Sequence, residues 1–169
     1  MVSLFAQLFL AIQDKIVADV PEIVWIDQDL GQLESYSVRP NVQFPCVLID
    51  FPNTVYSNNG QQVQWADIGS ISIRLGFAPY TSANSEAPDI SKEDALNYYE
   101  LEHKLYMALE GFDADGAVQP LNRISAQTEN RDDTFRVRQL VFTTATEDDS
   151  AKITERIQVA GLQVLPDVQ

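Results

Sequence analysis

The stretch that decides the fold is Ser91–Phe112, SKEDALNYYELEHKLYMALEGF, which has the pattern of one amphipathic helix. Four of its apolar residues share one face of such a helix: Tyr98, Leu101, Leu105 and Leu109. Ser91 is a candidate N-cap, and Glu93 and Asp94 place negative charge at the positive end of the helix dipole. Gly111 stands where helices often end in a left-handed conformation. We therefore predict a helix that packs one face against the domain.

The segments on both sides of this helix have the patterns of β-strands. Before it, four apolar residues alternate with Ser70, Ser72, Arg74 and Gly76, which places them on one face of a strand: Ile71, Ile73, Leu75 and Phe77. After it, the segment TFRVRQLVFTTAT from Thr134 has two partly apolar faces, so we expect its second face to be covered. Upstream, the apolar run 45–51 predicts a central strand, and Asn59-Gly60 predicts a hairpin turn with an extended tip.

The N-terminal residues predict a second helix, over about 3–18, that ends before Pro21. One of its faces is apolar, through Leu4, Leu8, Ile12 and Ile16, and it lacks the basic residues of a signal peptide. A short strand from Glu22 and a long connection over 30–44 follow it. Together these elements predict an α+β fold, a mainly antiparallel sheet packed by an N-terminal and a central helix. We expect one domain over residues 1–149 and a C-terminal extension over 150–169, either an edge strand or an inter-subunit arm.

The chain of 169 residues has a formal net charge of −14, so it should repel a phosphate backbone, and sequence-specific nucleic-acid binding is not expected. The charge has two interpretations, namely solubility and an acidic surface past which DNA slides without adhering. The single cysteine, Cys46, excludes an intramolecular disulfide. No stretch is long and apolar enough to predict a membrane span.

The sequence contains no motif that predicts catalysis or cofactor binding. The one histidine, His103, is expected to be structural, since a metal site would need ligands that the sequence does not place near it. We therefore expect no catalytic, cofactor-binding or metal-binding residues, and no enzyme.

The arginines Arg74, Arg136 and Arg138 lie on predicted strands and allow two interpretations. One is pairing with carboxylates of the same chain, and the other is ion pairing between subunits of a head-to-tail ring. Four aromatic residues lie in or near predicted loops: Trp25, Tyr56, Trp65 and Tyr80. If exposed, they would suit an interface, although aromatic residues more often pack in the core.

The order of elements resembles that of the tail terminator (tail completion) proteins of long-tailed bacteriophages. The resemblance covers residues 4–148 and is carried by the N-terminal helix and four segments: FPCVLIDFP from Phe44, ISIRLGFAPY from Ile71, ALNYYELEHKLYMALEGF from Ala95 and FRVRQLVFTTATE from Phe135. It implies a ring, typically a hexamer, that caps the tail tube, stops its polymerisation and joins the head connector while DNA passes through the centre. No catalytic residue is implied.

We therefore expect a virion structural protein of the tail or neck, assembled in the host cytoplasm, whose partners are itself, the tail tube protein and a head-completion or connector protein. Candidate ring contacts are Arg74, Arg136, Arg138, Ile157 and Val159. Candidate tube or connector contacts are Tyr56, Asn59, Gly60 and Tyr80. The alternatives are another neck or head-completion protein of a virion and a cellular acidic α+β ligand-binding domain.

Overall fold

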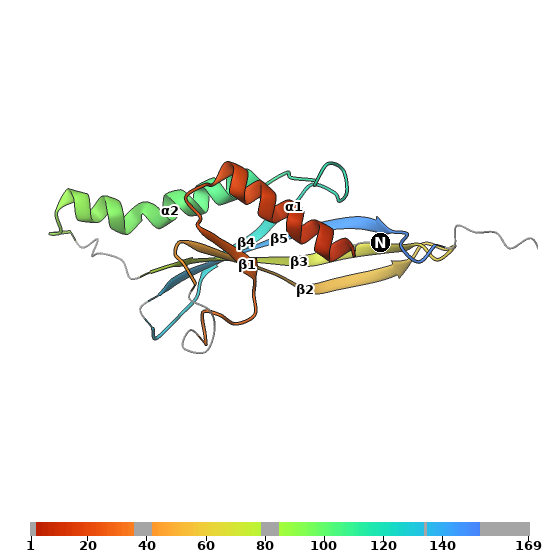
Figure 1. Cartoon of the computed structure of the whole chain (residues 1–169), viewed down its shortest axis with the longest axis horizontal. Coiled ribbons are helices and arrows are strands. Elements are labelled where there is room, and N and C mark those ends of the chain that lie inside the picture. Colours follow the sequence, from red (N-terminus) through yellow and green to blue (C-terminus); the bar gives the residue numbers. More distant parts are fainter. Residues whose placement is uncertain (1–2, 36–41, 79–84, 134, 153–169) are drawn as a thin grey trace, which may run out of the picture.

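The computed structural model describes residues 3–35, 42–78, 85–133 and 135–152. In chain order the elements are α1 (Leu4–Asp19), β1 (Trp25–Gln28), β2 (Cys46–Asn58), β3 (Gln64–Phe77), α2 (Asp89–Leu109), β4 (Asn122–Thr128) and β5 (Arg136–Asp148), as Figure 1 shows. The strands form one sheet in the order β1-β2-β3-β5-β4, and only the β1–β2 pair is parallel. The predicted α+β fold with a mainly antiparallel sheet and two packing helices is confirmed.

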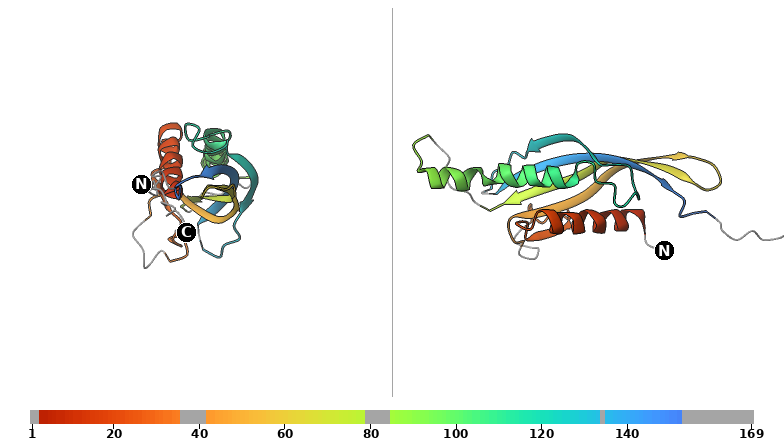
Figure 2. Two further views of the ribbon diagram at one scale, coloured as in Figure 1. Left: turned by 90° about the vertical axis from the view of Figure 1, so that its right-hand side faces the viewer. Right: turned by 90° about the horizontal axis from the view of Figure 1, so that it is seen from above.

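The two helices lie on the same face of the sheet (Figure 2). In α1 the hydroxyl of Ser3 accepts a hydrogen bond from the amide of Ala6, and the predicted apolar face is buried at Leu8, Ile12 and Ile16. In α2 the predicted apolar stripe is buried at Tyr98, Leu101, Leu105 and Leu109. Gly111 follows this helix with φ of +78°, as the sequence predicts.

The predicted N-cap of α2 was wrong. The helix begins at Asp89 with Pro88 as the capping residue, so Ser91 lies within the first turn. The carbonyl oxygen of Pro88 accepts hydrogen bonds from the amides of Ser91 and Lys92. The backbone of Pro88 has φ of −57° and ψ of 148°, the extended conformation of a helix-preceding residue, and the proline ring fixes that φ without any side-chain bond.

The main core fills the space between the helices and the sheet. Its fully buried side chains come from α1, α2 and three strands, and include Ile12, Ile16, Ile73, Leu75, Leu105 and Phe142. Each such side chain contributes about 1.5–3 kcal/mol by leaving water. The predicted apolar face of β3 therefore lies against the helices.

A smaller core lies on the opposite face of the sheet and consists of Leu33, Val42, Cys46, Leu48 and Val137. Residues of the β1–β2 connection cover this face, and Phe44 stacks on Phe135 with ring centroids 4.9 Å apart. The close packing requires glycine at position 76, since an added Cβ would lie 2.8 Å from the sulfur of Cys46. The prediction that the second face of the last strand is covered is thus confirmed at Val137, whereas Gln139 and Val141 on that face are half-buried.

The molecule is long, and its two ends differ (Figures 1 and 2). At one end the first turns of α2 extend past the sheet, and at the other the β2–β3 hairpin and the end of β5 extend past the helices. The hairpin tip is an extended turn, because the amide of Asn59 bonds to the carbonyl of Val63 across Gly60, Gln61 and Gln62. These three residues all have positive φ, between 53° and 82°.

Candidate assembly surfaces

The three arginines predicted to share one ring surface lie on two faces of the sheet. Arg138 extends toward α2, where its guanidinium forms two hydrogen bonds of 2.7 Å with the carboxylate of Glu102 and one of 2.9 Å with Thr128. Arg74 lies on the opposite face, among the loops that cover the smaller core. For these two residues the pairing is within the chain.

Arg74 is the centre of an ion-pair cluster that joins three segments distant in sequence. Its guanidinium donates to Asp29 and Glu34 of the β1–β2 connection and to Glu129 after β4, with a 2.8 Å bond to Asp29. The side chain is only 10% exposed. Arg131 extends the cluster, since its guanidinium bonds to Glu34, Glu129 and Asp133 and to the carbonyl of Leu33.

The charges in this cluster are strongly coupled. Hydrogen bonding to Arg74 lowers the pKa of Glu34 from 4.5 to about 2, with a further contribution from Arg131, and burial opposes this shift. Burial also disfavours the charged form of Arg74, but the bonds to Glu129, Glu34 and Asp29 outweigh it and raise its pKa. Arg74 therefore stays charged and bound within its own chain.

Arg136 differs from the other two. Its guanidinium lies over the ring of Tyr98, 3.9 Å from the centroid, and 5.9 Å from that of Tyr99. Among the described residues its Nε is buried without a hydrogen-bond partner, and no carboxylate pairs with the group. Cation–π attraction holds the side chain against α2, and the Nε–H finds no acceptor among the described residues.

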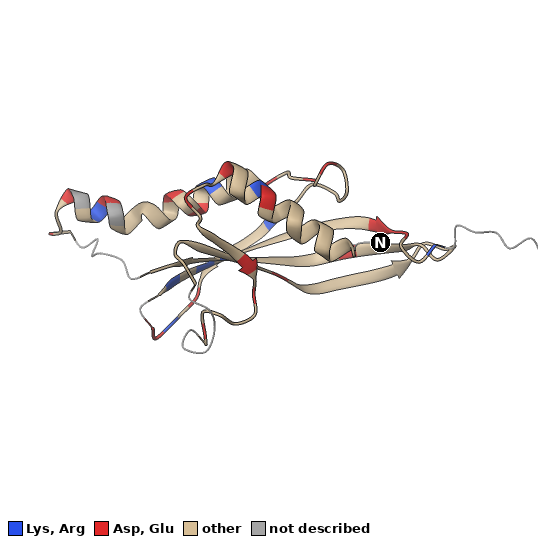
Figure 3. Ribbon diagram, viewed as in Figure 1, with Lys and Arg blue, Asp and Glu red and all other residues tan. Residues whose placement is uncertain are grey.

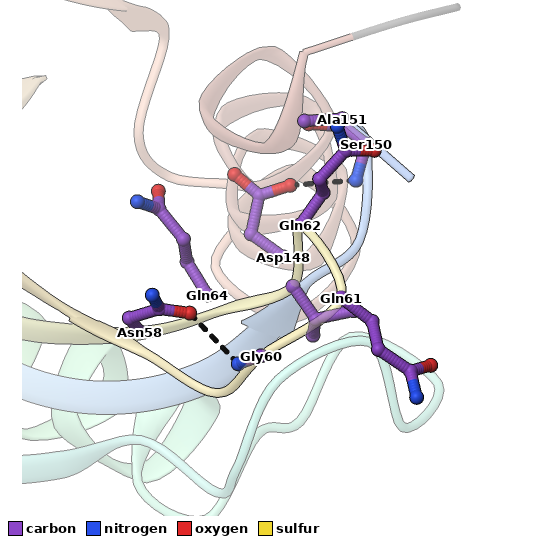
Figure 4. A pocket seen from close by; sticks show the side chains of 9 residues that line it. Asn58, Gly60, Gln61, Gln62, Gln64, Asp148, Ser150 and Ala151 are labelled. Carbon is purple, nitrogen blue, oxygen red and sulfur yellow. Dashed lines mark hydrogen bonds between the residues drawn. The ribbon is translucent and has the colours of Figure 1, made fainter. Parts of the chain in front are cut away.

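The β2–β3 hairpin carries exposed apolar and aromatic side chains: Val55 at 60%, Tyr56 at 43% and Trp65 at 36% exposure. Tyr56 lies opposite Ala66 and Trp65 opposite Ser57, so the two aromatic residues are on opposite faces of the ribbon. At the tip, the side chain of Asn59 donates to Glu147 of β5, and the amide of Gly60 donates to Asn58. A shallow, largely polar hollow of about 480 Å³ adjoins this tip (Figure 4).

Three predicted contact residues, Tyr80, Ile157 and Val159, lie outside the described residues. The sequence analysis did not predict the three carboxylate partners of Arg74, namely Asp29, Glu34 and Glu129, or that Arg131 extends the cluster. Charged residues clustered in the stretch 129–133 were the available signal, because a run of opposite charges in one loop often forms such networks.

Most of the basic side chains that the structure describes are paired within the chain. Figure 3 shows acidic residues on both helices and in the loops that connect the strands. Of the described lysines and arginines, six form ion pairs in the chain: Lys15, Arg74, Lys92, Lys104, Arg131 and Arg138. Arg123, like Arg136, lies on a tyrosine ring, 3.7 Å from the centroid of Tyr106. The net surface is therefore acidic with few unpaired cations.

In the described part of the chain, the histidine and the cysteine, which are common catalytic residue types, lie apart from each other. His103 is exposed on α2, and burial raises the pKa of Cys46 to about 12, which keeps it a thiol. Among these residues no group of three or more His, Cys, Asp or Glu could hold a metal ion. No helix in the described ranges has both the length and the apolar character that crossing a membrane requires.

Comparison with known proteins shows a likeness in fold to solved structures. The fold is similar to that of a chain in the virion of a native gene transfer agent particle, with a TM-score of 0.54 and 14% sequence identity. The match covers 88% of this chain and 100% of that chain. No protein-family model matches the sequence, and no curated protein matches it either.

Proposed function

We propose that this protein is a virion structural protein that forms a ring, hexameric in the manner of the tail terminators it resembles, at the end of a phage tail tube. The observation that carries the proposal is the fold likeness to a chain of a gene transfer agent virion, which spans the whole of that chain. The helices and strands that carry the tail-terminator resemblance in the sequence occur in the same order in the structure. The ring would stop tube polymerisation and provide the surface for the head connector.

Ring closure requires a contact in which one surface of each subunit binds a different surface of the next. Arg136 suits such a contact, because its guanidinium is held in place by Tyr98 and has no carboxylate partner among the described residues. A carboxylate of the neighbouring subunit would complete it, and the acidic surface offers many. Arg74 and Arg138 would instead support this surface from within the subunit.

The β2–β3 hairpin is the proposed contact with the tube or connector. It extends past the helices at one end of the molecule, and it exposes Val55, Tyr56 and Trp65, which a partner would cover (Figure 2). Asn59 and Gly60 form the turn of this hairpin. Tyr80 and the C-terminal extension from residue 150 remain proposed contacts on the grounds of sequence.

The acidic character supports passage of DNA through the ring. A lumen with excess carboxylates repels the phosphate backbone and so does not retain the duplex. Under this proposal the protein has no cofactor and no enzymatic activity, and it is located in the virion after assembly in the host cytoplasm.

A capping assay tests the proposal. Tube subunits of the same virion are polymerised with and without this protein, and tube lengths are measured by electron microscopy. We expect the protein to bind tube ends and shorten the tubes. Arg136→Gln should weaken ring formation at least about tenfold, whereas Lys104→Gln, which removes the same charge from an exposed pair with Glu22, should not. Unchanged tube lengths with bare ends would reject the proposal.

A second candidate is another neck or head-completion protein of a virion. The structural likeness is to a virion chain without a stated position in the particle, so it supports a virion structural role in both cases, and only the sequence resemblance favours the tube end. Binding to isolated heads but not to tubes would select this alternative. The cellular ligand-binding alternative predicts a thermal shift with a metabolite. The hollow at the hairpin tip gives this alternative little support, because it is shallow and polar.

A further inference from the structure

The two edges of the sheet are unequally protected against pairing with another strand. β1 spans only four residues, and the carbonyl oxygens of Ile26 and Gln28 accept bonds from the side-chain amides of Gln13 and Gln32. Beyond β1, the edge of β2 contains Pro52, which has no N–H, and its pairing with β3 shifts register on both sides of Asn53. Proline and bulges are the devices that blunt an edge strand.

β4 at the other edge has fewer such devices. Its seven residues, NRISAQT, include neither proline nor lysine, and all but Arg123 are exposed. The amide of Glu129 bonds to the carbonyl of Val137 in continuation of the β4–β5 ladder. By the alternation of an antiparallel pair, Ala126 and Thr128 then direct their backbone N–H and C=O groups away from β5. Within the described residues no backbone group bonds to them from that side.

The residue at the register shift of β4 adds an apolar contact. Ile124 lies between the paired residues Arg123 and Ser125 and is 55% exposed. An open row of backbone groups beside an exposed isoleucine is a template for an added strand.

The chain itself contains a segment that fits this template. Residues 153–160, ITERIQVA, place Ile153, Glu155, Ile157 and Val159 on one side of an extended strand and Thr154, Arg156, Gln158 and Ala160 on the other. Residues 153–160 follow Lys152 directly and could span roughly 26–29 Å when extended.

The arrangement at the end of β5 favours a second copy over the same chain as the donor. β5 ends at Asp148, at the hairpin end of the sheet, where it pairs with Gln64. Between that end and β4, the segment 117–119 already occupies the outer edge of β5, because the amide of Gln119 bonds to the carbonyl of Ala145 and the hydroxyl of Thr146 to that of Ala117. This segment stands in the way of a direct return along the same edge.

We propose that the open edge of β4 accepts residues 153–160 of a second copy as an additional β-strand. Main-chain hydrogen bonds provide the affinity, and Ile157 and Val159 pack near Ile124 and Ala126. This inference rests on the proposed ring in so far as the second copy is the ring neighbour, and it names the contact that the C-terminal extension makes there.

Hydrogen exchange on the full chain tests the proposal. At concentrations where the protein self-associates, the amides of Ala126 and Thr128 should exchange at least about tenfold more slowly than on dilution. The variant Ile157→Pro, which removes an N–H and breaks an extended strand, should abolish this protection, whereas Ile157→Val should keep it. The proposal is overturned if the protection of these amides is unchanged by dilution, or if it persists in Ile157→Pro.

The acceptor side is tested by Ala126→Pro, which removes an N–H that points away from β5, with Ala126→Val as the matched control. Ile124→Lys gives a second, less disruptive block of the edge, and melting temperatures verify that each variant folds. Both blocks should lower self-association at least about tenfold, and association equal to that of the control would refute the edge contact.

Rings that form and cap tubes despite the blocks would reject this inference alone. Edge protection without tube binding would reject only the capping function.

Discussion

Replacement of Arg74 by methionine tests whether the ion-pair cluster holds the second face of the sheet together. The substitution keeps an unbranched chain of similar reach but leaves Asp29, Glu34 and Glu129 around a site without its cation. Breaking a buried pair by removing one partner costs about 3–5 kcal/mol. Because the side chain of Glu34 is 49% exposed and Arg131 remains nearby, we expect the lower end, about 3 kcal/mol at pH 7. For a chain of this size that corresponds to a drop of roughly 6–12 °C in melting temperature.

The same prediction has a pH dependence whose sign follows from Glu34. The folded pKa of this group is depressed to about 2 from an ordinary value of 4.5. Its contribution to stability is therefore complete above pH 4.5 and is lost as the pH falls from there toward 2. In Arg74→Met the group loses the cation that lowers its pKa most, while Arg131 remains, so the difference in unfolding free energy between wild type and variant should shrink across this window.

The assay is urea denaturation of both proteins at pH 7 and at pH 3, followed by circular dichroism. Lys104→Met is the control, since it removes an ion pair with Glu22 in which both partners are exposed, and should cost less than about 1 kcal/mol. The reasoning is refuted if Arg74→Met is no less stable than Lys104→Met at pH 7, or if its deficit grows as the pH falls.

Three further predictions concern packing and contact residues. Gly76→Ala should lower the unfolding free energy by about 1–3 kcal/mol, because the new Cβ would lie 2.8 Å from the sulfur of Cys46, and Gly76→Ala/Cys46→Ala should recover part of the loss in denaturant melts. The thiol of Cys46 should resist a thiol-reactive dye at pH 8 in the folded protein and react on unfolding, since it is buried and its pKa is raised to about 12; fast labelling of the native state would contradict this. Tyr56→Ser and Trp65→Ser should weaken binding to tube ends without lowering the melting temperature by more than a few degrees, and tight binding by both variants would exclude the hairpin as the contact.

The fold could be predicted from the sequence where the signal is local. The four-residue spacing of Leu101, Leu105 and Leu109 and the alternation from Ile71 to Phe77 each depend on neighbours within one element, so they predict the buried faces correctly. The left-handed residue at Gly111 is equally local. The start of α2 was misplaced because serine at position 91 offers a capping side chain, while Pro88 acts through its fixed backbone angle alone.

The surroundings of the arginines could not be predicted in this way. Arg74 bonds to residues 45, 40 and 55 positions away in sequence, and no periodic pattern encodes which loops fold over a strand. The same holds for Arg138 with Glu102, 36 residues apart. The composition indicated that carboxylates would lie near the arginines. Only the folded structure shows that Arg136 lies on a tyrosine ring, whereas Arg74 and Arg138 are already paired with carboxylates.

The measurement that tests the central claim most directly is the native mass of the full chain across a concentration series, with and without tail tubes. The account predicts a closed ring of about six subunits, in solution or on tube ends, with no open-ended series of larger species. A monomer or dimer at every concentration that leaves tube ends free would contradict it.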